Sequence, residues 1–162
     1  MPGLNLAEGC HIVNLLPPAD NSGGVVCSVI DVRRYSHVTL IWTTGVTAAN
    51  IGDITIEEGY DLAMTASPNM RFRYYVEATA AGDVLDTGPT WAVAATGIDG
   101  DVSVGGADNT TVVIEIDTSE MTSGYGFLRV NKTAAGGATF DSIVAILSGA
   151  RSAGYASPTV LA

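Results

Sequence analysis

Short runs of β-branched and aromatic residues recur along the chain, and several of them alternate between apolar and polar positions. Phe72, Tyr74 and Val76 are separated by polar or amphipathic neighbours, and Ile114 and Ile116 follow the same pattern. Successive side chains of a strand point to opposite faces, so this alternation predicts strands with one buried and one solvent-facing side. Such runs, bounded by Gly, Asn, Asp or Pro, predict about eight strands. They cover residues 25–32, 37–42, 54–58, 71–78, 90–95, 111–117, 125–132 and 142–147.

Helical signals are scarce by comparison. Residues 117–124 can form one helical turn, capped by Thr118 or Ser119 and ended by Gly124. No amphipathic helix separates successive strands, which argues against βαβ units and a parallel sheet. The sequence therefore predicts an all-β protein: an antiparallel β-sandwich of about eight strands with at most one short helical turn, and a jelly roll as the leading form.

The length of 162 residues fits one domain with a single core. We expect the β-sandwich to span residues 21–148, preceded by an N-terminal arm at 1–20 and followed by a C-terminal arm at 149–162. The C-terminal segment consists mostly of small residues and carries one charge, Arg151. A tail in solvent is usually more polar, so this segment is predicted to lie against a protein surface, either a neighbour's or its own.

Composition and charge exclude some classes of partner. The chain is 47% hydrophobic and only 15% charged, with a net charge of -10, and Lys132 is its one lysine. Binding to nucleic acid without sequence preference needs clustered Lys and Arg, so no nucleic-acid partner is expected. The two arginine pairs, 33–34 and 71–73, are predicted to have ordinary surface or ion-pair roles.

The first residues carry Glu8 and His11 and lack the basic and long apolar regions of a signal peptide. This predicts synthesis in the cytoplasm without export, and a reducing compartment favours free thiols at Cys10 and Cys27. No run approaches the ~20 apolar residues of a membrane helix, so no membrane association is expected.

No constellation of residues predicts catalysis. Neither His11 nor His37 has a recognisable catalytic neighbour in the sequence, and nucleophile, zinc and phosphate-binding motifs are missing. Glu57 and Glu58 are adjacent on a predicted strand, so they should point to opposite faces and not act as a carboxylate pair. The sequence thus predicts a protein that is not an enzyme and has no cofactor.

Two further groups of residues leave alternatives open. Asp99, Asp101 and Asp108 share one Gly-rich loop, which is either solvated or a calcium site, although its spacing matches no known calcium loop. Among the aromatics, core positions are predicted for Trp42, Tyr74 and Trp91. Tyr75 and Tyr155 are predicted to lie outside.

Five stretches that together span nearly the whole chain carry a resemblance: "LPPADNSGG", "RRYSHVTLIWTTGVTAANIGDITIEE", "RFRYYVEATAAGD", "VVIEIDTSEMTSGYGFLRVN" and "VAILSGARSAGYASPTVLA". In these stretches the chain resembles small structural proteins of tailed bacteriophages. The resemblance is strongest to head decoration (cement) proteins. It implies a β-sandwich that is made in the host bacterial cytoplasm and binds the outer surface of the assembled capsid. The implied partners are the major capsid protein and further copies of the chain, in a homotrimer.

For such a protein, the candidate interface comprises apolar residues of the two arms and outward aromatic or charged residues. They are Leu4, Leu6, Ile12, Val13, Leu15, Tyr75, Arg151, Tyr155, Pro158, Val160 and Leu161. Two alternatives remain open. A phage tail-tube, head-completion or fibre-base component would have the same composition, and a carbohydrate-binding module would use exposed aromatics such as Tyr75 and Tyr155.

Overall fold

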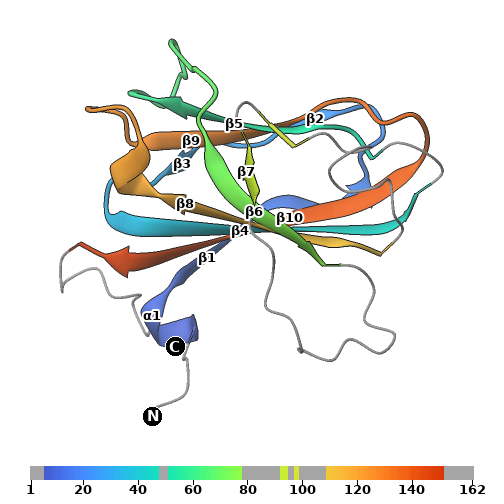
Figure 1. The fold of residues 1–162 in the computed structure, drawn as a ribbon, viewed down its shortest axis with the longest axis horizontal. Helices are drawn as coiled ribbons and strands as arrows, with labels where there is room; N and C mark the ends of the chain where they lie inside the picture. The colour runs from blue at the N-terminus through green and yellow to red at the C-terminus, as the bar shows by residue number, and fades with distance from the viewer. Residues whose placement is uncertain (1–5, 48–50, 78–91, 95–96, 99–108, 152–162) are drawn as a thin grey trace.

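The computed structural model describes residues 6–47, 51–77, 92–94, 97–98 and 109–151, which form two antiparallel sheets packed face to face (Figure 1). Within these residues, helical structure is confined to a four-residue helix and a 3-10 turn. In chain order the elements are α1 (Leu6–Gly9), β1 (His11–Asp20), β2 (Val25–Val26), β3 (Ile30–Asp31), β4 (Tyr35–Thr47), β5 (Ile54–Gly59), β6 (Phe72–Glu77), β7 (Ala92–Ala94), β8 (Thr111–Asp117), η1 (Thr118–Glu120), β9 (Phe127–Lys132) and β10 (Thr139–Ala150).

The larger sheet has six strands in the order β1-β10-β4-β8-β6-β7. Its two longest strands, β4 and β10, are neighbours inside the sheet and pair from Tyr35↔Ala150 to Thr47↔Thr139. Every neighbouring pair is antiparallel. The strand order brings the N-terminal and C-terminal described strands together at one side of the sheet.

The smaller sheet is arranged around β9, which pairs with β5 along one side and with β2 and β3 along the other. Between β2 and β3 the Cys27 amide donates to the Val130 carbonyl at 2.9 Å. The predicted strand 25–32 is therefore an interrupted strand that follows β9 in two short pieces.

The predicted all-β antiparallel sandwich is confirmed, and the predicted helical turn is the 3-10 turn η1. The jelly-roll form is not established by this strand order. The predicted caps are not used: the Thr118 hydroxyl donates to the Tyr35 carbonyl at 2.9 Å, and Asp117 makes no side-chain cap. Gly124 follows the turn with a φ of +88°, a left-handed conformation that favours glycine.

Strand β1 is the main element that the sequence analysis missed. Part of the segment 1–20, expected as an arm, is this strand, which pairs with β10 from His11↔Leu147 to Asp20↔Phe140. The register shifts between Asn14 and Leu16 and again between Leu16 and Ala19. A bulge places one extra residue on a strand, which lets both Leu15 and Leu16 point into the core.

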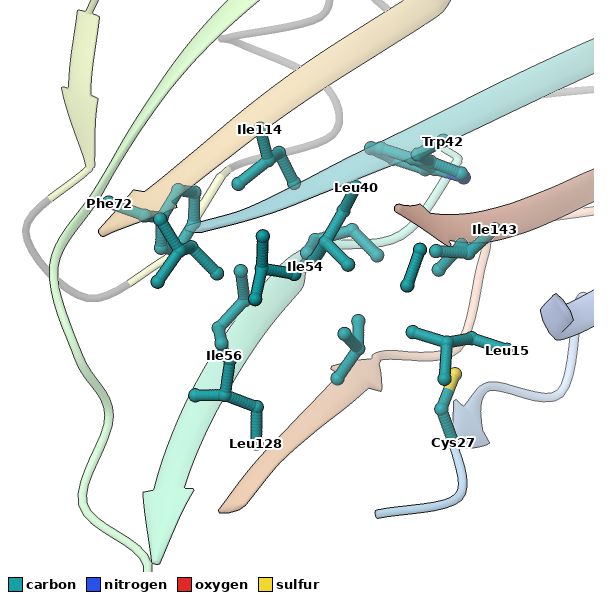
Figure 2. Close-up of a cluster of buried hydrophobic side chains, with 14 of the residues drawn as sticks. Leu15, Cys27, Leu40, Trp42, Ile54, Ile56, Phe72, Ile114, Leu128 and Ile143 are labelled. Atoms are coloured by element: carbon teal, nitrogen blue, oxygen red, sulfur yellow. The ribbon is translucent and has the colours of Figure 1, made fainter. Parts of the chain in front are cut away.

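Alternate side chains of both sheets fill the space between them. Figure 2 shows Leu40 of β4, Ile54 of β5 and Leu128 of β9 among these side chains, and each is at most 1% exposed. The core extends from Leu15 and Cys27 at one end to Phe72 at the other (Figure 2). Burying an aliphatic or aromatic side chain of this size contributes about 1.5–3 kcal/mol, so this interior is the main source of stability.

One polar cluster crosses the core between the sheets. Lys132 ends β9, Asp141 lies near the start of β10, and neither side chain has exposed surface. Lys132 Nζ lies 3.3 Å from Asp141 Oδ2 and donates to the Asn21 carbonyl at 3.0 Å. Asp141 accepts hydrogen bonds from Asn21 Nδ2 at 2.6 Å and from Trp42 Nε1 at 3.1 Å. We call these four residues the buried ion-pair cluster, in which both charges have partners.

Candidate functional site

The outer side of the six-stranded sheet carries a stripe of apolar side chains. These residues alternate with core residues along β10, β4 and β8, and register places them next to one another across the strands. Val144 pairs with Ile41, and Ile41 pairs with Val113. With their neighbours on β1, β10 and β6, they form what we call the apolar stripe: Ile12, Ile146, Val144, Ile41, Val113 and Tyr75.

Side chains directly opposite each other on neighbouring strands are about 4.5–5.5 Å apart at Cβ, so the members of the stripe shield one another. Five of the six are half-buried, while Ile12, on strand β1, is 52% exposed. An interface core is typically depleted of charge and enriched in apolar and aromatic groups. The stripe has this character.

A charged cluster adjoins the stripe. His37 of β4 contacts two carboxylates of β8, through Nδ1 to Asp117 at 2.8 Å and through Nε2 to Glu115. The Thr39 hydroxyl donates to the same Glu115 carboxylate at 2.7 Å. Arg73 of β6 completes the wall of a surface depression of about 280 Å³. The arrangement can hold a proton between the histidine and the carboxylates.

Burial and carboxylates act in opposite directions on the pKa of His37. Partial burial lowers it, whereas the hydrogen bonds and charges of Asp117 and Glu115 raise it, and the net shift is upward from 6.5. A raised folded-state pKa contributes stability that is fully present below the unfolded value and is lost as pH rises through the folded value. The charged histidine thus stabilises the pairing of β4 and β8 in acid more than in alkali.

We therefore expect His37→Gln to reduce the free energy of unfolding at pH about 6 and to have less effect at pH about 9. Urea unfolding of both proteins at the two pH values measures the difference. The control is Glu115→Gln, in which His37 loses one carboxylate and the pH dependence should weaken. An equal loss at both pH values would contradict this account of His37.

Farther along the same sheet lies a second surface depression, of about 370 Å³. Its wall includes Pro18 of β1, Gly45 of β4 and Phe140 of β10. Phe140 is 56% exposed, and the nearby Val46 is 67% exposed. Large apolar side chains are therefore accessible here as well, close to the irregular pairing of β4 with β10.

The acidic pair on β5 behaves as the sequence predicts. Glu57 forms an ion pair with Arg129, whose Nε donates at 2.7 Å, while Glu58 is buried on the opposite face. The Glu58 carboxylate accepts hydrogen bonds from the Thr122 amide, at 2.8 Å, and from the Thr122 hydroxyl. Glu58 borders a depression of about 430 Å³ beside β6, but its carboxylate is already held by its own chain.

The predicted interface residues that the structure describes differ in how accessible they are to a partner. Leu6 and Ile12 are exposed, and Val13 packs partly against the core. Leu15 is only 7% exposed, so it is a core residue and is not accessible to a partner. Arg151 bonds within its own chain, donating from Nε to the Tyr35 carbonyl at 3.1 Å and from its guanidinium to Thr118 Oγ1 at 2.6 Å.

Several other predicted residues lie outside the described part of the chain. These are the remaining interface residues, the core candidate Trp91 and the three aspartates of the possible calcium loop: Leu4, Tyr155, Pro158, Val160, Leu161, Trp91, Asp99, Asp101 and Asp108. Across the described ranges, no group of three or more His, Cys, Asp or Glu residues is arranged to hold a metal ion. None of the helices described there is long and apolar enough to cross a bilayer.

The sequence analysis missed the partners of His37. His37 and Thr39 share one face of β4, and Glu115 and Asp117 share one face of β8. Within each strand, the alternation of polar and apolar residues in the sequence already indicates which side chains share a face. Their contact depends on the register His37↔Asp117 and Thr39↔Glu115, which joins segments far apart in the chain. No local pattern contains that register.

Comparison of the chain with protein-family models, curated proteins and solved structures finds no match in any of the three.

Proposed function

We propose that this chain is a structural virion protein that binds the outer surface of an assembled phage capsid and stabilises it, with no enzymatic activity. The observation that carries the proposal is the apolar stripe, which crosses the outer side of the six-stranded sheet from β1 to β6. The low content of charged residues and the sequence resemblance to decoration proteins agree with it.

Stabilisation by such a protein follows from mass action. A protein that binds the assembled shell, and not the separate capsid subunits, shifts the equilibrium toward the shell. If three copies associate, each later contact with the shell becomes intramolecular, and avidity exceeds the affinity of one copy. A homotrimer that contacts the major capsid protein is therefore the assembly we propose.

The stripe suits a contact of this kind because it is apolar without being fully exposed. Half-buried valine and isoleucine side chains can complete their burial against a partner, and Tyr75 provides an aromatic group at the side of β6. Aromatic residues are enriched among the residues that dominate binding energy at interfaces. The neighbouring charges of His37, Glu115 and Asp117 would then form part of a polar rim.

A lysine in the stripe should weaken capsid binding. We expect Val144→Lys to reduce the affinity for empty phage heads by about tenfold or more, since a charge would be buried at the contact. The matched control is Val26→Lys, the same substitution on β2 of the smaller sheet, where the side chain is 66% exposed. Co-sedimentation of each purified variant with heads from the source phage measures the affinities.

Both variants should first unfold at the same temperature as the natural protein, so that a loss of binding can be attributed to the changed surface and not to misfolding. Equal binding by the two variants would exclude the apolar stripe as the contact.

Gold-antibody labelling of purified virus particles tests the location of the protein separately. Label over the head supports the proposal, whereas label on the tail would assign the protein to the tail tube or fibre base, and unlabelled particles would contradict a virion role.

A further inference from the structure

We propose that Lys132 and Asp141 condense into an intramolecular isopeptide bond that covalently joins β9 to β10. This inference is independent of the proposed function. It rests on the buried ion-pair cluster, in which the one lysine of the chain meets a carboxylate inside the core. The reacting groups are already in contact, because Lys132 Nζ lies 3.3 Å from Asp141 Oδ2.

The reaction needs no further reagent. Transfer of one proton from the Lys132 ammonium to the Asp141 carboxylate gives a neutral amine and a carboxylic acid. The amine lone pair then attacks Asp141 Cγ, the carbon–oxygen bond to the hydroxyl breaks, and the second amine proton leaves with that hydroxyl as water. The products are one amide and one water molecule, with no oxidation or reduction.

Burial favours the condensation. Two charges removed from water are costly, and an amide carries neither of them. The surroundings are strongly desolvated: burial, followed by the charge of Asp141, raises the pKa of the Cys27 thiol to about 11. The Lys132 stem is also enclosed by the backbone, since a side chain on Gly52 would lie 3.5 Å from Lys132 Cε and only 2.5 Å from the Thr133 carbonyl oxygen.

The cluster also holds the carboxyl group in place for attack. Asn21 Nδ2 donates to Asp141 Oδ1 at 2.6 Å, and Trp42 Nε1 donates to Oδ2 at 3.1 Å. Donors fixed around a carboxyl group stabilise the negative charge that develops on oxygen during attack by a nucleophile. Holding amine and acid together in one geometry removes most of the entropic cost of bringing them together.

Mass spectrometry of the purified full chain tests the bond directly. We expect the intact mass, measured after unfolding, to be lower than the sequence mass by one water molecule. Trypsin should fail to cleave after Lys132, so that residues 130–151 appear as one peptide that contains both joined residues and is lighter by one water. The Lys132→Arg variant, which keeps the charge but lacks the amine, should have the full sequence mass.

Two outcomes would contradict the proposal. A full intact mass with normal cleavage after Lys132, both in fresh protein and after prolonged incubation at neutral pH, shows that the pair remains ionic. A water loss with normal cleavage after Lys132 places the dehydration elsewhere, for example as a succinimide at Asp141. A mixture in which the cross-linked fraction increases with incubation supports slow formation of the bond.

Discussion

Lys132→Met is expected to lower the free energy of unfolding by about 3–5 kcal/mol, because the Asp141 carboxylate is then buried with neither a cation nor an amide bond to Lys132. The natural side chains have no exposed surface, so water cannot replace the lost partner without opening the core. Urea unfolding followed by tryptophan fluorescence measures the change, since Trp42 lies in the same cluster.

The double variant Lys132→Met/Asp141→Leu provides the control. Replacing both members of a buried ion pair by apolar residues is often neutral or stabilising, so the double variant should be more stable than Lys132→Met alone. Some loss should remain, because the indole N–H of Trp42 loses its Asp141 acceptor, whereas Asn21 Nδ2 keeps the Ala19 and Asp141 carbonyls. The loss of stability in the double variant should be smaller than the sum of the losses in Lys132→Met and Asp141→Leu measured separately. If it equals that sum, Lys132 and Asp141 are not coupled and the buried pair does not explain the effect of Lys132→Met.

Phe72→Ala is expected to cost about 3–5 kcal/mol of stability, the range for removing a buried aromatic side chain. Phe72 is 1% exposed and lies at the β6 end of the core, where Figure 2 shows it beyond Ile56 and Ile114. The loss combines the transfer free energy of the ring with the cavity that remains between the sheets. Thermal and urea unfolding both report it.

Phe140→Ala removes the same side chain from the outer surface of the six-stranded sheet and serves as the matched control. Phe140 is 56% exposed, so its truncation should change the free energy of unfolding by less than about 1 kcal/mol. Similar losses in the two variants would mean that Phe72 is not a core residue of the folded protein.

The strands could be predicted from sequence wherever alternation was regular. Ile54 and Ile56, or Ile114 and Ile116, point inward in the structure as their spacing predicts. β1 was missed because its bulge places Leu15 and Leu16 side by side in the core, which breaks the period of two. Two prolines follow directly and read as a loop signal.

The candidate sites were less predictable than the strands. The apolar stripe depends on which strands are neighbours, and the order β10-β4-β8 places the C-terminal described strand between β1 and β4. Lys132 was noticeable as the single lysine, but its partner Asp141 lies on the other sheet. Partners brought together by chain topology leave no signal in local hydrophobic periodicity.

The two edges of the six-stranded sheet have a consequence for behaviour at high protein concentration. In the described chain these edges are β1 and β7. Pro17 and Pro18 lack backbone N–H groups and coincide with the register shift in β1, while β7 has just three residues. Neither edge offers a long regular ladder that could recruit an unpaired strand from another molecule. Among the described residues, pairing of one copy with another through an edge of the six-stranded sheet is therefore disfavoured, and contacts through its outer side chains meet no such obstacle.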